Sequence, residues 1–274
     1  MSFNYEQSIW GKGEASLRWS DPTGFRLHEA LESIKSVKSI KDGETASVLE
    51  VGCGAGQFIR AVKRIRPELD CHGADISLEA IALAKKNGDG VNYALSESKK
   101  LPYADGAMDA VLIFDVLEHV EDPAGLVAEI RRVLKPGGVF YCFVPCEGDI
   151  LSLWHCLRKI GVGGDLTKKH AGHINYFSRA SLGQLFEKSN WQTVQIHYSE
   201  HFFGQLLGIM AFVLMDRAAK RQGAVQINNE TYFTANDGGV LKLLKNVINS
   251  LVYLESSLLK SVPSPNVHMT VKKR

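Results

Sequence analysis

The chain has 274 residues, a length that suits one large α/β domain with a modest addition. Hydrophobic residues make up 45% and charged residues 23%, which excludes disorder, collagen and coiled coil as the main state. The 32 Lys and Arg residues face 30 Asp and Glu residues, so a net charge of +2 gives no strong field for nucleic acid. Scattered cysteines, an N-terminus without a signal-like apolar region and no run of 18 apolar residues predict a reduced, cytoplasmic protein without a spanning helix.

Residues 1–45 are predicted to form a helical N-terminal cap, because Leu27, Leu31 and Ile34 recur at helical spacing. Short apolar strands are then expected at 47–51, 72–75, 91–94, 109–115 and 139–144. Helical patterns separate them, with start signals at Ser77 and Pro123. This alternation is typical of parallel βαβ units, whose ligand binds beyond the carboxyl ends of the strands.

The regular alternation of strands and helices ends after the fifth predicted strand. A helix is expected from Ser178 to Asn190, followed by a strand over 191–198. Residues 201–263 are mostly helical in pattern, and 266–272 alternate apolar and polar residues as a half-buried edge strand does. The predicted core therefore comprises 46–200 and 264–274, with a helical insertion over 201–263.

Glycines cluster directly after the first predicted strand, in the sequence Glu50-Val-Gly52-Cys-Gly54-Ala-Gly56. Glycine lets the backbone turn sharply and approach a ligand, and the helix that follows presents N–H groups to an anion. Asp75 lies 19 residues beyond Gly56, at the end of the second predicted strand, where a carboxylate can accept from ribose hydroxyls. Because Gln57 occupies the third glycine position of the NAD fingerprint, NAD is disfavoured. A tight turn that binds nothing is the alternative.

The motif Glu-Val-Gly-Cys-Gly-Ala-Gly resembles the first motif of class I S-adenosylmethionine-dependent methyltransferases. Segments 101–111, 115–123, 134–138 and 173–182 resemble later family segments, in order and at the family's spacing. The resemblance covers about 45–198 and the last strand, and is to the group with quinone, sterol-like and small-molecule enzymes. It implies the cofactor S-adenosylmethionine and a doubly wound, seven-stranded, mostly parallel α/β sheet with an antiparallel last strand.

The resemblance also implies which residues bind the cofactor. Gly52, Gly54 and Gly56 are expected to line its methionine portion. Glu50 is expected to hold this loop and to reach the amino group, and Asp75 to bind both ribose hydroxyls.

The remaining cofactor residues are expected around the adenine and the sulfonium. Ile76 would lie against the adenine, while Glu97 would accept from its N6 and Ser98 would contribute its backbone. Glu97 stands where the family usually has Asp, which lengthens its reach. Phe114 and Asp115 would begin the loop under the sulfonium.

Three histidines are candidates for the acceptor side. Methyl transfer to a hydroxyl requires a base, and neutral histidine suits physiological pH. His119 follows the fourth predicted strand, and His170 and His173 lie between the fifth strand and the late helix. We expect His173 to be the base and His119 to be the next candidate, with surface or capping roles as the alternative.

A divalent metal is a further hypothesis at this place. Some quinone O-methyltransferases that this stretch resembles bind one through an acid-x-x-acid-His pattern, which Asp115, Glu118 and His119 match. The alternative is that Glu118 and His119 begin a helix and hold no ion.

The favoured function is O-methylation of a small-molecule, saccharide or lipid-linked acceptor. A catalytically silent S-adenosylmethionine-binding protein and an RNA methyltransferase are the alternatives. The first conflicts with the intact Glu50, Asp75 and glycine set, and the second with the scattered basic residues.

The uncharged stretch 202–215 is too short to span a bilayer, and Arg217, Lys220 and Arg221 follow it. The sequence therefore predicts a peripheral contact with the inner face of a membrane, or a homodimer, through 201–262. The alternative is that these helices pack on each other and on the sheet.

Overall fold

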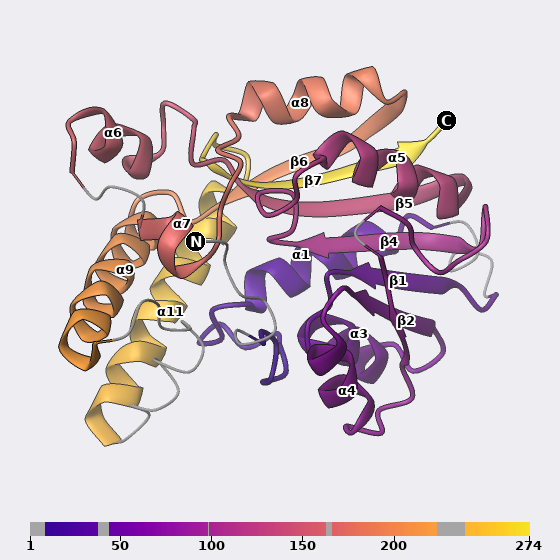
Figure 1. Cartoon of the computed structure of the whole chain (residues 1–274), viewed down its shortest axis with the longest axis horizontal. Coiled ribbons are helices and arrows are strands. Elements are labelled where there is room, and N and C mark those ends of the chain that lie inside the picture. The colour runs from indigo at the N-terminus through magenta and orange to yellow at the C-terminus, as the bar shows by residue number, and fades with distance from the viewer. Residues whose placement is uncertain (1–8, 38–43, 98, 163–165, 224–238) are drawn as a thin grey trace.

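The computed structural model describes residues 9–37, 44–97, 99–162, 166–223 and 239–274 (Figure 1). Within these residues one seven-stranded sheet has the order β3-β2-β1-β4-β5-β7-β6. The strands are β1 (Ser47–Val51), β2 (Asp70–Asp75), β3 (Asn92–Leu95), β4 (Met108–Phe114), β5 (Leu134–Pro145), β6 (Trp191–Ser199) and β7 (Asn266–Lys273). β1 to β5 pair in parallel, whereas β7 is antiparallel to both of its neighbours. The predicted methyltransferase-type sheet is confirmed.

Helices cover both faces of the sheet (Figure 1). One face carries α1 (Gly24–Ile34), α3 (Gln57–Ile65) and α4 (Leu78–Lys85), and the other carries α5 (Pro123–Val133) and α8 (Arg179–Lys188). α6 (Leu153–Lys159), α7 (Leu166–His170), α9 (Phe203–Gln222) and α11 (Gly239–Leu259) gather beyond one end of the strands. The result is a three-layer domain with a helical group at one side.

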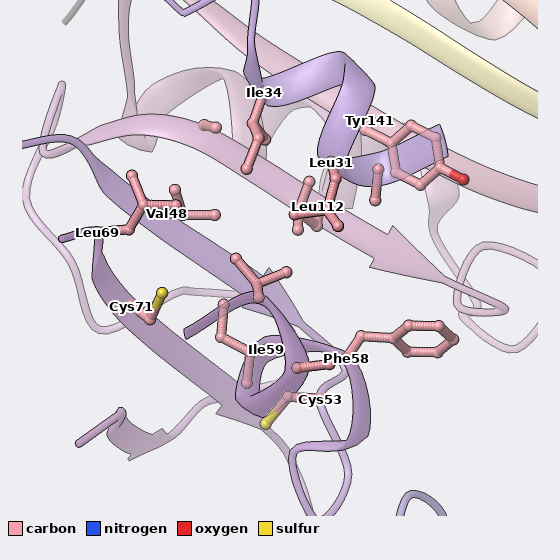
Figure 2. Close-up of a cluster of buried hydrophobic side chains, with 14 of the residues drawn as sticks. Leu31, Ile34, Val48, Cys53, Phe58, Ile59, Leu69, Cys71, Leu112 and Tyr141 are labelled. Carbon is pink, nitrogen blue, oxygen red and sulfur yellow. The ribbon is translucent and has the colours of Figure 1, made fainter. Parts of the chain in front are cut away.

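The central strands β1, β4 and β5 are largely apolar because both of their faces are covered. All seven residues of β4 are buried. Leu112 packs with Val48, Ile34 and Ile59 under α1 and α3, as Figure 2 shows. Its neighbours Val111 and Ile113 point to the opposite cluster, below α5 and α8. One strand thus stabilises two cores.

The predicted helix starts are confirmed by their caps. The Ser77 hydroxyl accepts from the Ala80 N–H at 3.1 Å, which begins α4. The Asp122 carboxylate accepts from the Gly125 N–H at 2.9 Å, ahead of α5. Ser178 forms a capping box at the start of α8. Each cap satisfies N–H groups that the first turn of a helix leaves unpaired.

Three details differ from the sequence prediction. β7 is not an edge strand: it lies between β5 and β6, and β6 forms the edge. β5 begins at Leu134 rather than Val139, because Leu134 already pairs with Met108 across a register shift. The predicted N-terminal helical cap is mostly not helical: among its described residues, Gly24–Ile34 forms the only helix.

The predicted helical insertion before the last strand is confirmed, since α9 and α11 lie between β6 and β7 in the chain. Residues 224–238 of this insertion lie outside the described residues. Among the helices that the structure describes, none combines the length and apolar character needed to cross a bilayer.

Candidate functional site

The glycine loop follows β1 in a conformation that side chains disfavour. Gly52, Gly54 and Gly56 have φ values of 74°, 53° and 89°. A Cβ atom on Gly54 would lie 2.5 Å from the Trp10 carbonyl oxygen, and one on Gly56 would lie 2.4 Å from the Tyr93 hydroxyl. Both distances are far below a normal contact, so the loop requires glycine at these positions.

Asp75 fastens this loop to the end of β2. Its Oδ2 accepts from the Gly54 N–H at 2.8 Å, and its Oδ1 accepts from the Ser77 N–H at 2.9 Å. The Ala74 carbonyl accepts from the Gly52 N–H at 2.8 Å. The carboxylate therefore stands beside the glycine loop, where the sequence predicts ribose binding.

Glu50 supports the loop from below. Its side chain is buried, and Oε2 accepts from the Ile59 N–H in the first turn of α3 at 2.8 Å. Burial raises the pKa of Glu50 well above its ordinary value. This carboxyl group fixes the start of α3 relative to β1, and its contact with a cofactor amino group stays a prediction.

The other predicted cofactor residues have different surroundings. Ile76 is 52% exposed directly after β2, and the exposed Glu97 follows β3 in a bridge with Lys100. Ser98 lies outside the described residues. Phe114 is buried at the end of β4 and stacks on Phe58 at 3.8 Å between ring centroids. Ile76 and Glu97 are therefore accessible to a ligand, whereas Phe114 belongs to the core below.

Asp115 begins the loop after β4 in a left-handed conformation, with φ of 52°. Its Oδ2 accepts from Arg26 Nη1 at 2.6 Å, and Arg26 Nη2 contacts Glu200 Oε1 at 3.2 Å. Burial alone would lower the pKa of Arg26, but the two carboxylates outweigh it and raise that pKa. Sequence reasoning missed Arg26, which lies on α1 and 89 residues from Asp115.

The two favoured histidines meet beside this loop. The His119 and His173 rings lie 4.9 Å apart between centroids, nearly perpendicular at 77°. Glu118 completes the group, and one ligand atom from each residue lies within 4.8 Å of the others. His170 is elsewhere: its Nε2 lies 3.3 Å from Asp216 Oδ1, between α7 and α9.

Hydrogen bonds fix the orientation of both rings. His173 Nδ1 lies 2.9 Å from Glu147 Oε1, and His119 Nδ1 lies 3.2 Å from the carbonyl of the residue before His173. Glu147 Oε2 accepts in turn from Thr167 Oγ1 at 2.9 Å and Arg158 Nη1 at 3.1 Å. Burial works to raise the pKa of Glu147, but these partners together lower it. Sequence reasoning missed Glu147, although its place directly after β5 is a usable signal.

Glu118 is fully buried, and neither of its carboxylate oxygens has a hydrogen-bond partner among the residues that the structure describes. Burial raises its pKa well above the ordinary value. Two imidazoles and a carboxylate are a donor set that suits a divalent transition-metal ion, and outward hydrogen bonds on ring nitrogens are typical of metal-binding histidines. The hypothesised set of Asp115, Glu118 and His119 is corrected: Asp115 pairs with Arg26, and His173 takes its place.

This group is carried by segments that adjoin the glycine loop. A Cβ atom on Gly52 would lie 2.6 Å from Val116 Cγ2, which places the loop after β4 against the glycine loop. The Glu118 carbonyl accepts from the Ile174 N–H at 2.9 Å, and so ties the segment that carries His173 to the same place. The loop after β4, which carries Glu118 and His119, therefore lies against the glycine loop.

Comparison with known proteins agrees with this geometry. A family model described as a methyltransferase domain matches residues 25–196, more than half of the chain. The chain is 34% identical over 180 residues to the ubiquinone/menaquinone biosynthesis C-methyltransferase of Desulfotalea psychrophila, which covers 60% of this chain and 72% of that protein. It is also 34% identical to a ubiquinone biosynthesis O-methyltransferase of Thiobacillus denitrificans, over 47% of this chain and 58% of that protein. A structure of a sarcosine dimethylglycine methyltransferase from Galdieria sulphuraria has the same fold, with a TM-score of 0.57, 14% identity and coverage of 90% and 84% of the two chains.

Proposed function

Because the chain belongs to the S-adenosylmethionine-dependent methyltransferases, we propose that it methylates an oxygen of a small-molecule, saccharide or lipid-linked acceptor. The observation that carries this proposal is the group of the buried Glu118 and His173 with the half-buried His119, on a loop that lies against the glycine loop. Methylation at oxygen is favoured because a hydroxyl must lose its proton, and a histidine held by a carboxylate is suited to accept it.

The cofactor residues remain those of the sequence prediction. Gly52, Gly54 and Gly56 form the loop for the methionine portion, and Asp75 stands at the ribose position. The exposed Ile76 and Glu97 would contact the adenine, and Ser98 completes this proposed set. Asp115 would approach the sulfonium with its position fixed by Arg26.

Methyl transfer is an in-line displacement. The acceptor oxygen forms a bond to the methyl carbon, the carbon–sulfur bond breaks, and its electron pair stays on sulfur, which leaves as a neutral thioether. The hydroxyl proton passes to His173, and the imidazolium that forms is stabilised by Glu147 at 2.9 Å. His119 is the second candidate for this role.

The same residues fit a divalent metal ion, held by Glu118, His119 and His173 with Glu147 behind His173. A bound ion would act as a Lewis acid on an acceptor oxygen. Proton acceptance and metal ligation through the same ring nitrogen exclude each other, so the metal content of the purified protein distinguishes the two roles of His173.

The acceptor class is inferred from chemistry and from the relatives' names. Those names include quinone-biosynthesis enzymes and a malonyl-[acyl-carrier protein] O-methyltransferase of Hahella chejuensis, which is 29% identical over 56% of this chain and 52% of that protein. These names support small acceptors with apolar or carrier-bound parts. They support neither RNA nor a silent binding role.

The test incubates the purified protein with cell extract and S-adenosylmethionine that carries a labelled methyl group. The mixture is then separated into lipid, small-molecule, protein and RNA fractions. We expect label in the lipid or small-molecule fraction, and a loss of roughly 10²- to 10⁴-fold in rate for His173→Asn or His119→Asn, whichever is the base. His155→Asn on α6 is the matched control. Label in RNA alone, tight cofactor binding without label, or full rates in both site variants would contradict the proposal.

A further inference from the structure

α9 presents one stripe to solvent that changes character along the helix. Its outer positions Phe203, Leu206, Met210 and Leu214 are 56%, 41%, 52% and 44% exposed. They recur at steps of three and four residues, so they share one face. The next exposed position on this face is Arg217. The stripe is therefore apolar over most of its length and basic toward its end.

The opposite face of α9 is already packed. Met215 and Ala219 are fully buried, and Phe212 meets Trp154 of α6 edge-on with 5.7 Å between ring centroids. Asp216 accepts from Lys169 of α7 at 2.6 Å. Because these contacts fix the inner face, the apolar stripe points away from the domain.

α11 also presents an apolar stripe to solvent. Outward positions are Leu244, Val247, Leu251, Leu254 and Leu258, which are between 39% and 74% exposed. Its inner side contacts the N-terminal segment through the ring of Tyr253, stacked on Trp19 at 5.6 Å. Soluble monomers seldom leave two such stripes uncovered, so a partner is expected.

Charge distinguishes the partner. In the described residues of the two helices, the basic side chains are Arg217, Lys220, Arg221, Lys242 and Lys245, and the acidic ones are Asp216 and Glu255. Asp216 is bound to Lys169 and Lys220, and Glu255 accepts from the Phe202 N–H at the start of α9. Both carboxylates are engaged within the chain, so the same two helices of a second copy offer little to match Arg217 and Arg221. An anionic lipid surface offers phosphate headgroups beside an apolar layer.

We propose that the outer faces of α9 and α11 bind the surface of an anionic phospholipid bilayer. Phe203, Leu206, Met210 and Leu214 enter the boundary between headgroups and acyl chains, and Arg217 contacts phosphate. α9 is joined to the acceptor side, because Gln205 Oε1 accepts from the Leu153 N–H at 2.8 Å in the segment that follows Glu147. If the methyl-transfer proposal holds, this arrangement delivers a lipid-like acceptor to the histidines.

The test is flotation of the full chain with vesicles of phosphatidylglycerol and phosphatidylcholine, and with vesicles of phosphatidylcholine alone. We expect binding to the anionic vesicles, and its weakening at 0.5 M salt because salt screens the charges. The double variants Leu206→Gln/Met210→Gln and Arg217→Glu/Arg221→Glu should each weaken binding by at least roughly tenfold. Val194→Gln, which removes an apolar side chain 45% exposed on β6, should float as the native chain does.

Titration with S-adenosylmethionine shows whether each variant is folded, and light scattering reports the oligomeric state without lipid. No flotation, flotation that survives both double variants, or equal binding to neutral vesicles would overturn the proposal. So would a dimer that Leu206→Gln/Met210→Gln separates, because the stripe would then be a self-interface. Vesicle binding is measured without acceptor, so its failure leaves the methyl-transfer proposal standing.

Discussion

Replacing Asp75 with Asn separates the two tasks of this carboxylate. Both oxygens accept from backbone N–H groups, of Gly54 at 2.8 Å and of Ser77 at 2.9 Å. An Asn side chain has one acceptor oxygen and an NH₂ group that cannot accept, so one of these N–H groups loses its partner. An unsatisfied buried donor costs about 1–3 kcal/mol, and because Asp75 is half-buried we expect about 1–2 kcal/mol of lost stability without cofactor.

The second effect of Asp75→Asn appears on the cofactor. Loss of a charged acceptor for ribose hydroxyls costs about 1.5–3 kcal/mol, so we expect S-adenosylmethionine to bind roughly 10- to 100-fold more weakly. Urea denaturation of the cofactor-free protein measures the first effect, and titration calorimetry measures the second. Asp70→Asn is the control, since Asp70 begins the same strand at the opposite end and contacts His72 at 2.8 Å. Native stability and native affinity in Asp75→Asn, or an equal loss of affinity in Asp70→Asn, would refute this reasoning.

Three further changes test the rest of the site and its support. Gly56→Ala should destabilise the fold by about 2–3 kcal/mol, because residue 56 has a positive φ and the new Cβ atom would overlap Tyr93. Adding Tyr93→Phe should restore part of the lost free energy of unfolding in urea denaturation. A Gly56→Ala variant as stable as the native chain would contradict the described loop. Glu147→Gln should lower turnover about 10- to 100-fold through the orientation of His173 while cofactor affinity stays constant, and a matched loss of cofactor affinity would point to general damage. Asp216 accepts from two lysines that lower its pKa, so its contribution to stability is present above its unfolded pKa of about 4 and is lost as the pH falls through and below that value. Asp216→Asn should therefore lower the free energy of unfolding at pH 7 by more than it does near pH 3, and an equal difference at both pH values would exclude this ion pair as the cause.

Local patterns predicted the parts of the site that lie next to a strand end. His119 follows β4 and Glu50 lies near the end of β1, and parallel strands bring their carboxyl ends to one edge of the sheet. Arg26 could not be found this way, because it lies on a helix remote in sequence from both of its carboxylate partners. The sequence pattern of α1 indicates an apolar face for packing and gives no sign that Arg26 binds these carboxylates. Glu147 carried the same signal as His119 and was overlooked because the segment after β5 is irregular.

Short apolar runs predicted where the strands lie, but such patterns do not determine which strands are neighbours. The last strand shows this limit. Its apolar and polar residues alternate as they do in an edge strand, yet both of its edges are paired, with β5 on one side and β6 on the other. Polar residues such as His268 are accommodated in its interior by hydrogen bonds, here to Tyr141 at 2.7 Å and to Ser199 at 2.8 Å.

The position of β7 also sets an order on chain synthesis. β6 pairs with no described strand other than β7, which spans Asn266–Lys273 near the end of the 274 residues. While the ribosome still covers those residues, β6 has no strand to join, and α9 and α11 have already been made with their apolar stripes. The first five strands can form their parallel sheet during translation, but closure of the remaining part must wait until β7 has left the ribosome. Chaperones or a lipid surface would therefore meet the helical insertion before the sheet beside it is complete.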